Sequence, residues 1–249
     1  MNITRPTFQA LFERDLSLLA NSICAQCDAQ LRHPLLPWLL GERFAETAER
    51  IMFIGKPHRG VPGEILQSGV IDPTSVVAEE LWNKNWPYWS YTKEVAENIY
   101  GSRASDFICF SNMIKCTNTP GSQDGNSTDR TSYVMAECCV SKLCVIWQEI
   151  KNVEARTLVF YTFRLFRSVL HHVPIALAGS VREITPQSHT VQCRNKRLGW
   201  WERTCKTSWT DDLRILVVGH PERMGRNEFV ELLTNWLRTR KTTCSAIHA

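Results

Sequence analysis

Two polar side chains follow apolar runs in a way that suits recognition of a small polar ring. Asn112 comes directly after the run Phe107–Ser111, and His220 comes after the run Arg214–Gly219. Ligands of open α/β sheets bind at the carboxyl ends of strands, so both positions are candidates for a site. An Asn offers one acceptor and two donors, enough to read the edge of a pyrimidine. The open alternatives are capping of the next segment for Asn112 and a structural role for His220.

Thiols form a second candidate group. The chain has ten cysteines, which is many for a cytosolic protein, where disulfides are rare. Cys24 and Cys27 form a Cys-x-x-Cys pair whose thiolates can reach one metal centre, as in zinc and iron–sulfur sites. Cys109 lies inside an apolar run and fits a small core residue better than a ligand. A redox pair, or two half-buried thiols, remain alternatives for Cys24 and Cys27.

A basic loop follows the first apolar run, Arg50–Gly55. Within residues 56–64 it carries Lys56, His58 and Arg59 among Gly and Pro residues. Loops at the ends of strands commonly hold binding sites, and these cations suit a phosphate or another anion. A solvated surface turn is the alternative.

Aromatic residues gather in two other stretches. Residues 85–91 hold four aromatics that can stack on bases or pack in the core. Residues 180–212 interleave basic residues with Trp200, Trp201 and Trp209, a mixture that suits nucleic-acid backbones and bases. The alternative is a solvated β-excursion whose aromatic residues pack on the core. Leu198-Gly199-Trp200 is expected to form the turn of a hairpin there.

The elements that must position these groups are four short apolar strands, expected at residues 50–55, 107–111, 156–161 and 214–219, with helices between them. Strands that alternate with helices favour a parallel sheet covered on both faces. The fold class expected is therefore α/β, three-layer α/β/α with a central four-stranded, mainly parallel sheet. One domain is expected over 1–249, with a basic and aromatic insertion at about 180–212. A final helix is expected to be capped by Asn227.

Composition narrows the function classes. The net charge of +4 permits a nucleic-acid partner without demanding one. No run approaches the roughly 18 apolar residues of a membrane span. The N-terminus carries Glu13 and Asp15 and has no long apolar core, so it does not resemble a signal peptide. These features predict a cytoplasmic protein that does not bind membranes.

Four motifs in order make the chain resemble the uracil-DNA glycosylase superfamily, and its iron–sulfur branch in particular. Cys24-Ala-Gln-Cys27 resembles the first cluster pair of that family. Asn112-Met-Ile-Lys115-Cys116 resembles its Asn-x-x-Lys-Cys motif, and Glu137-Cys138-Cys139-Val-Ser-Lys-Leu143 resembles its Glu-Ala-Cys-x-x-x-Leu helix. His220-Pro221 resembles the start of its His-Pro-Ser loop. A lesser match outside these four is Pro87-Tyr88, which resembles the Pro-Phe of the family.

The resemblance implies a DNA glycosylase that flips a non-standard pyrimidine out of DNA and hydrolyses its N-glycosidic bond, leaving an abasic site. It also implies a 4Fe-4S cluster held by Cys24, Cys27, Cys116 and Cys139. Asn112 would read the base edge, Tyr88 would stack on the base, and His220 would donate to the departing anion. Contacts to DNA are expected from Lys115, Arg223, Met224, Arg226 and Arg197. The expected oligomeric state is a monomer without an obligate protein partner.

The first motif departs from the family. Where the cluster-bearing members read Gly-Glu-x-Pro-Gly, this chain has Gly55-Lys56-Pro57-His58. The carboxylate that would orient water is missing, and Glu64 or Asp72 are the substitutes considered. Lys56 and His58 beside the base site favour a larger or more polar base, such as the glucosylated hydroxymethylcytosine of some phages. Uracil remains an equal possibility. The rival functions are a catalytically inactive DNA-binding member and a zinc-binding α/β module.

Overall fold

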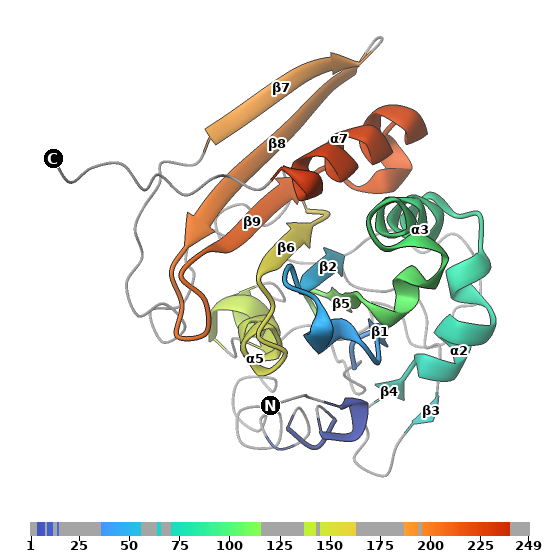
Figure 1. Ribbon diagram of the computed structural model, residues 1–249, viewed down its shortest axis with the longest axis vertical. Helices are drawn as coiled ribbons and strands as arrows, with labels where there is room; N and C mark the ends of the chain where they lie inside the picture. Colours follow the sequence, from blue (N-terminus) through green and yellow to red (C-terminus); the bar gives the residue numbers. More distant parts are fainter. Residues whose placement is uncertain are drawn as a thin grey trace, which may run out of the picture.

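The computed structural model describes residues 4–7, 9–11, 14, 36–55, 64–65, 71–115, 137–142, 145–162, 187–193 and 196–239 (Figure 1). The helices are α2 (Thr74–Glu79), α3 (Pro87–Tyr100), α5 (Val145–Asn152) and α7 (Arg226–Arg238). Shorter helical turns are η2 (Phe44–Glu46), η3 (Leu81–Asn83), η4 (Gly101–Asp106), η5 (Glu137–Lys142) and η6 (Pro221–Arg223). The strands are β1 (Leu39–Leu40), β2 (Ile51–Gly55), β3 (Glu64–Ile65), β4 (Ile71–Asp72), β5 (Cys109–Asn112), β6 (Thr157–Phe160), β7 (Gln187–Cys193), β8 (Lys196–Cys205) and β9 (Leu213–Val218).

The central sheet is mixed and has seven strands in the order β1-β5-β2-β6-β9-β8-β7. Strand β2 pairs in parallel with β5 and β6, and β6 pairs in parallel with β9. Strand β1 is antiparallel to β5 at one edge, and β8 and β7 add two antiparallel strands at the other. The α/β class is confirmed, but the expectation of four strands is wrong. The expectation rested on apolar runs. Strand β1 has only two residues and the hairpin β7–β8 is largely polar, so neither forms such a run.

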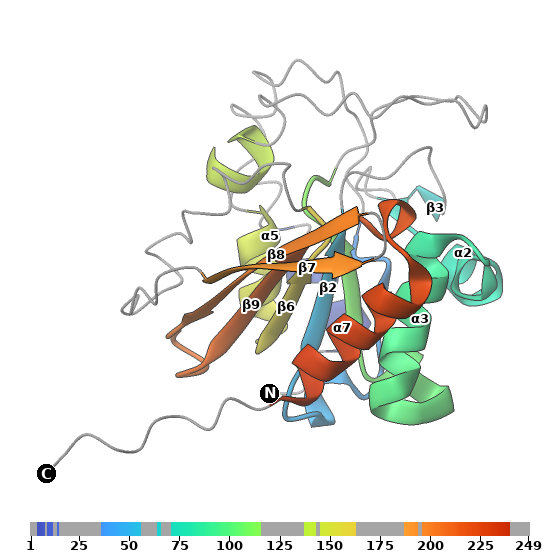
Figure 2. The same cartoon turned by 90° about the horizontal axis from the view of Figure 1, so that it is seen from above.

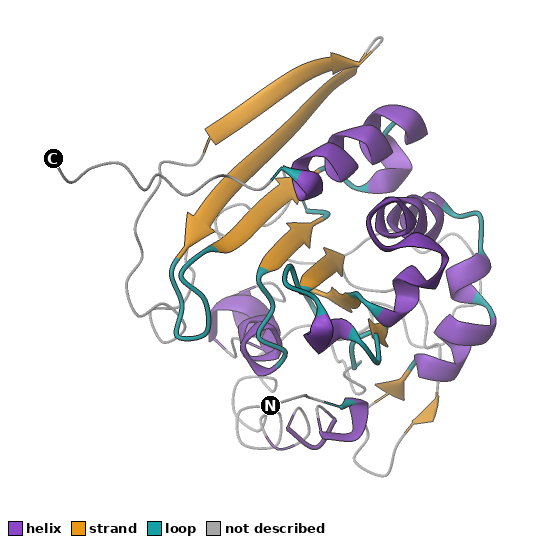
Figure 3. Cartoon of the chain, in the orientation of Figure 1, coloured by secondary structure: helices purple, strands orange, loops and turns teal. Residues whose placement is uncertain are grey.

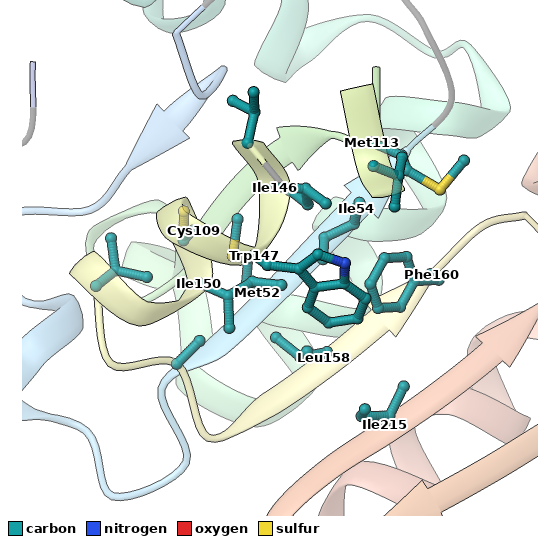
Figure 4. Packing of buried hydrophobic residues seen from close by; sticks show 14 of the residues in the cluster. Met52, Ile54, Cys109, Met113, Ile146, Trp147, Ile150, Leu158, Phe160 and Ile215 are labelled. Carbon is teal, nitrogen blue, oxygen red and sulfur yellow. The ribbon is translucent and has the colours of Figure 1, made fainter. Parts of the chain in front are cut away.

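The central strands are buried on both faces, which explains their nearly continuous apolar sequence. Every residue of β2 is buried. Successive side chains point to opposite faces, so Met52 and Ile54 enter one core while Ile51 and Phe53 enter the other. The first core surrounds Trp147 of α5 (Figure 4).

Helices cover both faces of the sheet. Helices α3 and α7 pack together on one face, and α5 covers the opposite face (Figures 1 and 2). Helix α3 begins at Pro87, a favourable first residue for a helix. The aromatic stretch at residues 85–91 therefore supplies the first turn of α3 rather than a separate platform. Helix α7 begins at Arg226 with Gly225 at its N-cap, so Asn227 does not cap it as expected.

The hairpin β7–β8 extends the main sheet rather than forming a separate excursion (Figure 3). Gly199 pairs with Thr190 inside the hairpin, so the expected turn at Leu198–Trp200 is wrong. Only residues 194–195 separate the two strands. Trp200 pairs with Val218, the last residue of β9. Residues 196–199 therefore project past the carboxyl end of β9, by about 13 Å at the usual rise per residue.

A small hairpin, β3–β4, stands apart from the seven-stranded sheet and pairs Glu64 with Asp72. The Asp72 carboxylate accepts from the Arg5 guanidinium at 2.6 Å and from the Thr74 backbone N–H at 3.0 Å. Burial acts to raise the pKa of Asp72, but the hydrogen bonds from Thr74 and Arg5 outweigh it and leave the pKa below its ordinary value of 3.8. Asp72 thus ties the N-terminal segment to the start of α2.

Asp72→Asn is expected to reduce the free energy of unfolding by about 1 kcal/mol at pH 7, since the ion pair is partly exposed. A carboxylate whose folded pKa is lowered contributes stability above its unfolded pKa, and that contribution disappears as the pH falls through the folded value. The difference between wild type and variant should therefore shrink below about pH 4. Urea unfolding at pH 7 and pH 3 measures it, with Glu79→Gln on α2 as a control for loss of one surface charge. A difference that is unchanged at pH 3 would contradict the assigned role.

Within the described residues, no helix is long and apolar enough to cross a membrane.

Candidate functional site

The site begins where two neighbouring parallel strands end. Gly55 at the end of β2 pairs with Asn112 at the end of β5. The chain reaches β5 from β2 through α3, on one face of the sheet, and reaches β6 from β5 through α5, on the other. Such a divergence is a topological switch point, where open α/β sheets place their ligands. The position predicted for Asn112 from the sequence matches this geometry.

The Asn112 carboxamide is buried, with 2% of the residue exposed. Its Oδ1 accepts a hydrogen bond from the Tyr88 hydroxyl at 3.0 Å. Its Nδ2 has no hydrogen-bond partner in the described part of the chain. A buried amide donor without a partner costs free energy that a ligand carrying an acceptor would recover.

Tyr88, in the first turn of α3, packs against several other rings, among them those of His220 and Phe110. Its ring is parallel to the His220 imidazole within 4°, with centroids 5.2 Å apart. The Phe110 ring lies 5.0 Å away at a tilt of 38°. Burial raises the pKa of the Tyr88 hydroxyl well above its ordinary value, and Tyr161 and Glu222 add to the rise. The hydroxyl is therefore a permanent donor to Asn112.

Gly55 makes this arrangement possible. A Cβ at this position would lie 1.6 Å from the Tyr88 Oη and 2.9 Å from the Asn112 Oδ1. No side chain larger than hydrogen fits while Tyr88 keeps its place. The glycine at the end of β2 is therefore needed for contact between α3 and β5, a role that the sequence pattern does not reveal.

His220 follows β9 and enters the same site from the η6 turn. Its side chain is 14% exposed. Its Nδ1 accepts from the Glu222 backbone N–H at 3.4 Å and lies 3.6 Å from the Glu222 Oε2. The structure thus brings together Asn112, Tyr88 and His220, three residues that the sequence singles out from distant segments.

Lys115 departs from its expected place. Its residue is 2% exposed, and its Nζ donates to Glu149 Oε2 at 2.6 Å and to Ser111 Oγ at 2.5 Å. The Ser111 hydroxyl donates to the same carboxylate oxygen at 2.8 Å. Burial raises the pKa of Glu149, and Lys115 and Ser111 limit that rise. The expected phosphate contact of Lys115 is corrected, because its ammonium is enclosed between β5 and α5.

The residues expected to touch DNA have different surroundings. Arg223 is exposed beside His220, whereas Met224 is partly buried, with its sulfur against Gly219. Arg226 is exposed and donates to Glu94 at 2.7 Å. Arg197 pairs with Gln192 in the projecting part of β8, and its side chain lies outside the described set.

The remaining predictions fall largely outside the described residues. These include Lys56, His58, Cys24, Cys27 and Cys116. Glu64 is described by its backbone alone, in β3. Cys139 is buried in η5, next to the core around Trp147. In the described ranges, no three His, Cys, Asp or Glu side chains gather as a metal group.

Thr162 is a polar residue at a strand end that the sequence reading missed. It follows β6, is 1% exposed, and its Oγ1 has no hydrogen-bond partner among the described residues. The sequence could have indicated Thr162, since it is a polar residue that directly follows the buried run ending at Tyr161.

No family model matches the sequence, and no curated protein matches it.

Proposed function

We propose that this protein is a DNA glycosylase that removes a flipped-out, non-standard pyrimidine and leaves an abasic site. The observation that carries the proposal is the convergence of Asn112, Tyr88 and His220 at the switch point, where the buried Asn112 Nδ2 has no partner among the described residues. A base edge that presents an acceptor would satisfy that donor. Flipping is required because the reacting bond is inaccessible inside a duplex.

Each residue has a distinct proposed task. The Asn112 amide reads the base edge by hydrogen bonds. His220 Nε2 donates to the base oxygen as negative charge develops on the departing base, the kind of preorganised donor that lowers such barriers. In the present arrangement the His220 imidazole is stacked on the Tyr88 ring, and the Phe110 ring lies 5.0 Å from it. A base that stacks on the same face as His220 would have to displace the imidazole.

The group that orients the water is proposed to be Glu64. Asp72 is less suitable because its carboxylate is held by Arg5 and Thr74. Glu64 lies opposite Asp72 in the β3–β4 pair.

DNA would reach the site along the projecting end of the β7–β8 hairpin. This end carries Lys196 and Arg197 and lies beyond the carboxyl end of β9, where His220 also lies. Arg223 on η6 adds another cation near this end of the strands. Cations in this position can neutralise phosphates, and the affinity would fall as the salt concentration rises.

Four thiols, from Cys24, Cys27, Cys116 and Cys139, are the donor set proposed for a 4Fe-4S cluster. Such a cluster would join the N-terminal segment to the chain after β5 and to η5. The proposed cluster is structural.

The test is a glycosylase assay with alkaline cleavage of abasic sites, run on uracil-containing DNA and on phage DNA that carries glucosylated hydroxymethylcytosine. Abasic sites in either substrate, lost in His220→Ala, support the proposal and identify the base. Asn98→Ala, on the opposite end of α3, is the control for loss of an amide that hydrogen-bonds elsewhere. Tight DNA binding without abasic product from either substrate would instead support the alternative, a catalytically inactive DNA-binding protein.

A further inference from the structure

The orientation of the Asn112 carboxamide has one visible cause, the Tyr88 hydroxyl. The Tyr88 Oη lies 3.0 Å from Oδ1. If the amide were rotated by 180°, Nδ2 would face the hydroxyl and Oδ1 would take the position without a partner. The hydroxyl hydrogen would then lose the acceptor that it has among the described residues. Burial keeps the Tyr88 hydroxyl protonated, and a protonated hydroxyl needs an acceptor. The hydroxyl therefore favours the orientation in which Oδ1 of Asn112 faces it.

Amide orientation decides which pyrimidine edge fits. Uracil presents an acceptor at O4 next to a donor at N3, whereas cytosine presents a donor at N4 next to an acceptor at N3. The two patterns are opposite, and a half-turn of the Asn amide converts a match to one into a match to the other. An amide that rotates freely therefore discriminates poorly, and one that is held discriminates well.

We propose that Tyr88 is a specificity-determining residue, because its hydroxyl holds the Asn112 carboxamide in the single orientation that matches only one of the two pyrimidine edges. This inference rests on the proposed function, since it takes a pyrimidine as the ligand. The hydroxyl does not itself touch the reacting bond, so Tyr88 acts through Asn112.

The surroundings of Tyr88 are built to keep the hydroxyl in place. The Phe110 ring packs against the Tyr88 ring, with centroids 5.0 Å apart. The backbone of Gly55 lies directly beneath the hydroxyl, where a Cβ would collide with it. The Tyr161 ring packs against the Tyr88 ring at 6.0 Å, and its own hydroxyl is bonded to Thr92, so it does not compete for Asn112.

The test measures binding rather than cleavage. Duplexes carry a single 2′-fluoroarabino nucleotide, with either uracil or cytosine, opposite the same mispaired base. The fluorine destabilises positive charge on the sugar, so the glycosidic bond survives the measurement. Fluorescence anisotropy gives the ratio of the two dissociation constants. We expect the wild type to prefer one base by about tenfold, and Tyr88→Phe to reduce the preference to about twofold or less.

The matched control is Tyr91→Phe, which removes a hydroxyl from the same helix, where the ring packs on Phe229 instead of the site. It should keep the wild-type ratio. Gly55→Ala provides a second route, since the added methyl displaces the Tyr88 hydroxyl without removing it, and it should also reduce the ratio. Thermal melting identifies a variant that is unfolded.

The outcomes are distinct. Equal binding of both bases by the wild type, or an unchanged ratio in Tyr88→Phe, would overturn the role of Tyr88. A tenfold preference that is lost in Tyr88→Phe supports it even if the wild type forms no abasic sites. In that case the proposed catalysis fails while the assignment of Tyr88 stands.

Discussion

Glu149→Ala is expected to lower the free energy of unfolding by about 3–5 kcal/mol, the cost of leaving a buried charge without its partner. The side chains of Lys115 and Glu149 are 2% and 1% exposed, and their Nζ and Oε2 atoms lie 2.6 Å apart. Removal of the carboxylate takes the negative charge away from the Lys115 ammonium, whose Nζ also donates to the Ser111 hydroxyl at 2.5 Å. Chemical denaturation at neutral pH, fitted to a two-state transition, measures the loss.

Two comparisons sharpen this experiment. The double variant Lys115→Met/Glu149→Leu should recover at least half of the lost stability, because apolar replacements of a buried ion pair are often neutral or better. Glu46→Ala, which breaks the exposed pair of Arg43 and Glu46 at 2.8 Å, should cost less than about 1 kcal/mol. A loss of less than 1 kcal/mol in Glu149→Ala would show that the ion pair is not enclosed as described.

Asn112→Ala is expected to reduce the single-turnover rate of base removal by about 10²–10³-fold, the typical effect of removing one preorganised hydrogen-bonding group from a site of this kind. The substrate is whichever DNA the wild type cleaves. The structural reason is that Asn112 supplies the one buried, unpartnered amide donor in the described part of the site. The measurement uses excess enzyme and alkaline cleavage of the product.

The affinity for undamaged DNA shows whether the substitution affects recognition of the base or binding to DNA in general. In the proposed function, phosphates would be contacted by residues other than Asn112. Asn112→Ala should therefore bind unmodified duplex as tightly as the wild type does at the same salt concentration. Asn98→Ala should keep the wild-type rate, since its amide bonds to Thr234 between α3 and α7. A rate within threefold of wild type in Asn112→Ala would remove this residue from the proposed site.

The four central parallel strands were predictable from local sequence alone. The apolar runs around Phe53, Phe110, Val159 and Leu216 predicted the four parallel strands with boundaries that differ by at most two residues. Burial on both faces demands apolar side chains at consecutive positions, and this demand is visible in any short window of sequence. The hairpin β7–β8 carries no such pattern, so its membership of the sheet was not predicted.

The candidate site also combines features that local sequence predicts with features that only the tertiary structure sets. By itself, the sequence determined that Asn112 and His220 lie where buried strands end, because the end of an apolar run is a local property. Tertiary structure alone decided that Lys115 turns inward to Glu149, 34 residues away, instead of outward to a phosphate. It also decided that the Tyr88 ring lies against His220 and that its hydroxyl engages Asn112 above Gly55. A charged or aromatic residue can satisfy its chemistry with many partners, and only the packing of distant segments determines which partner is within reach.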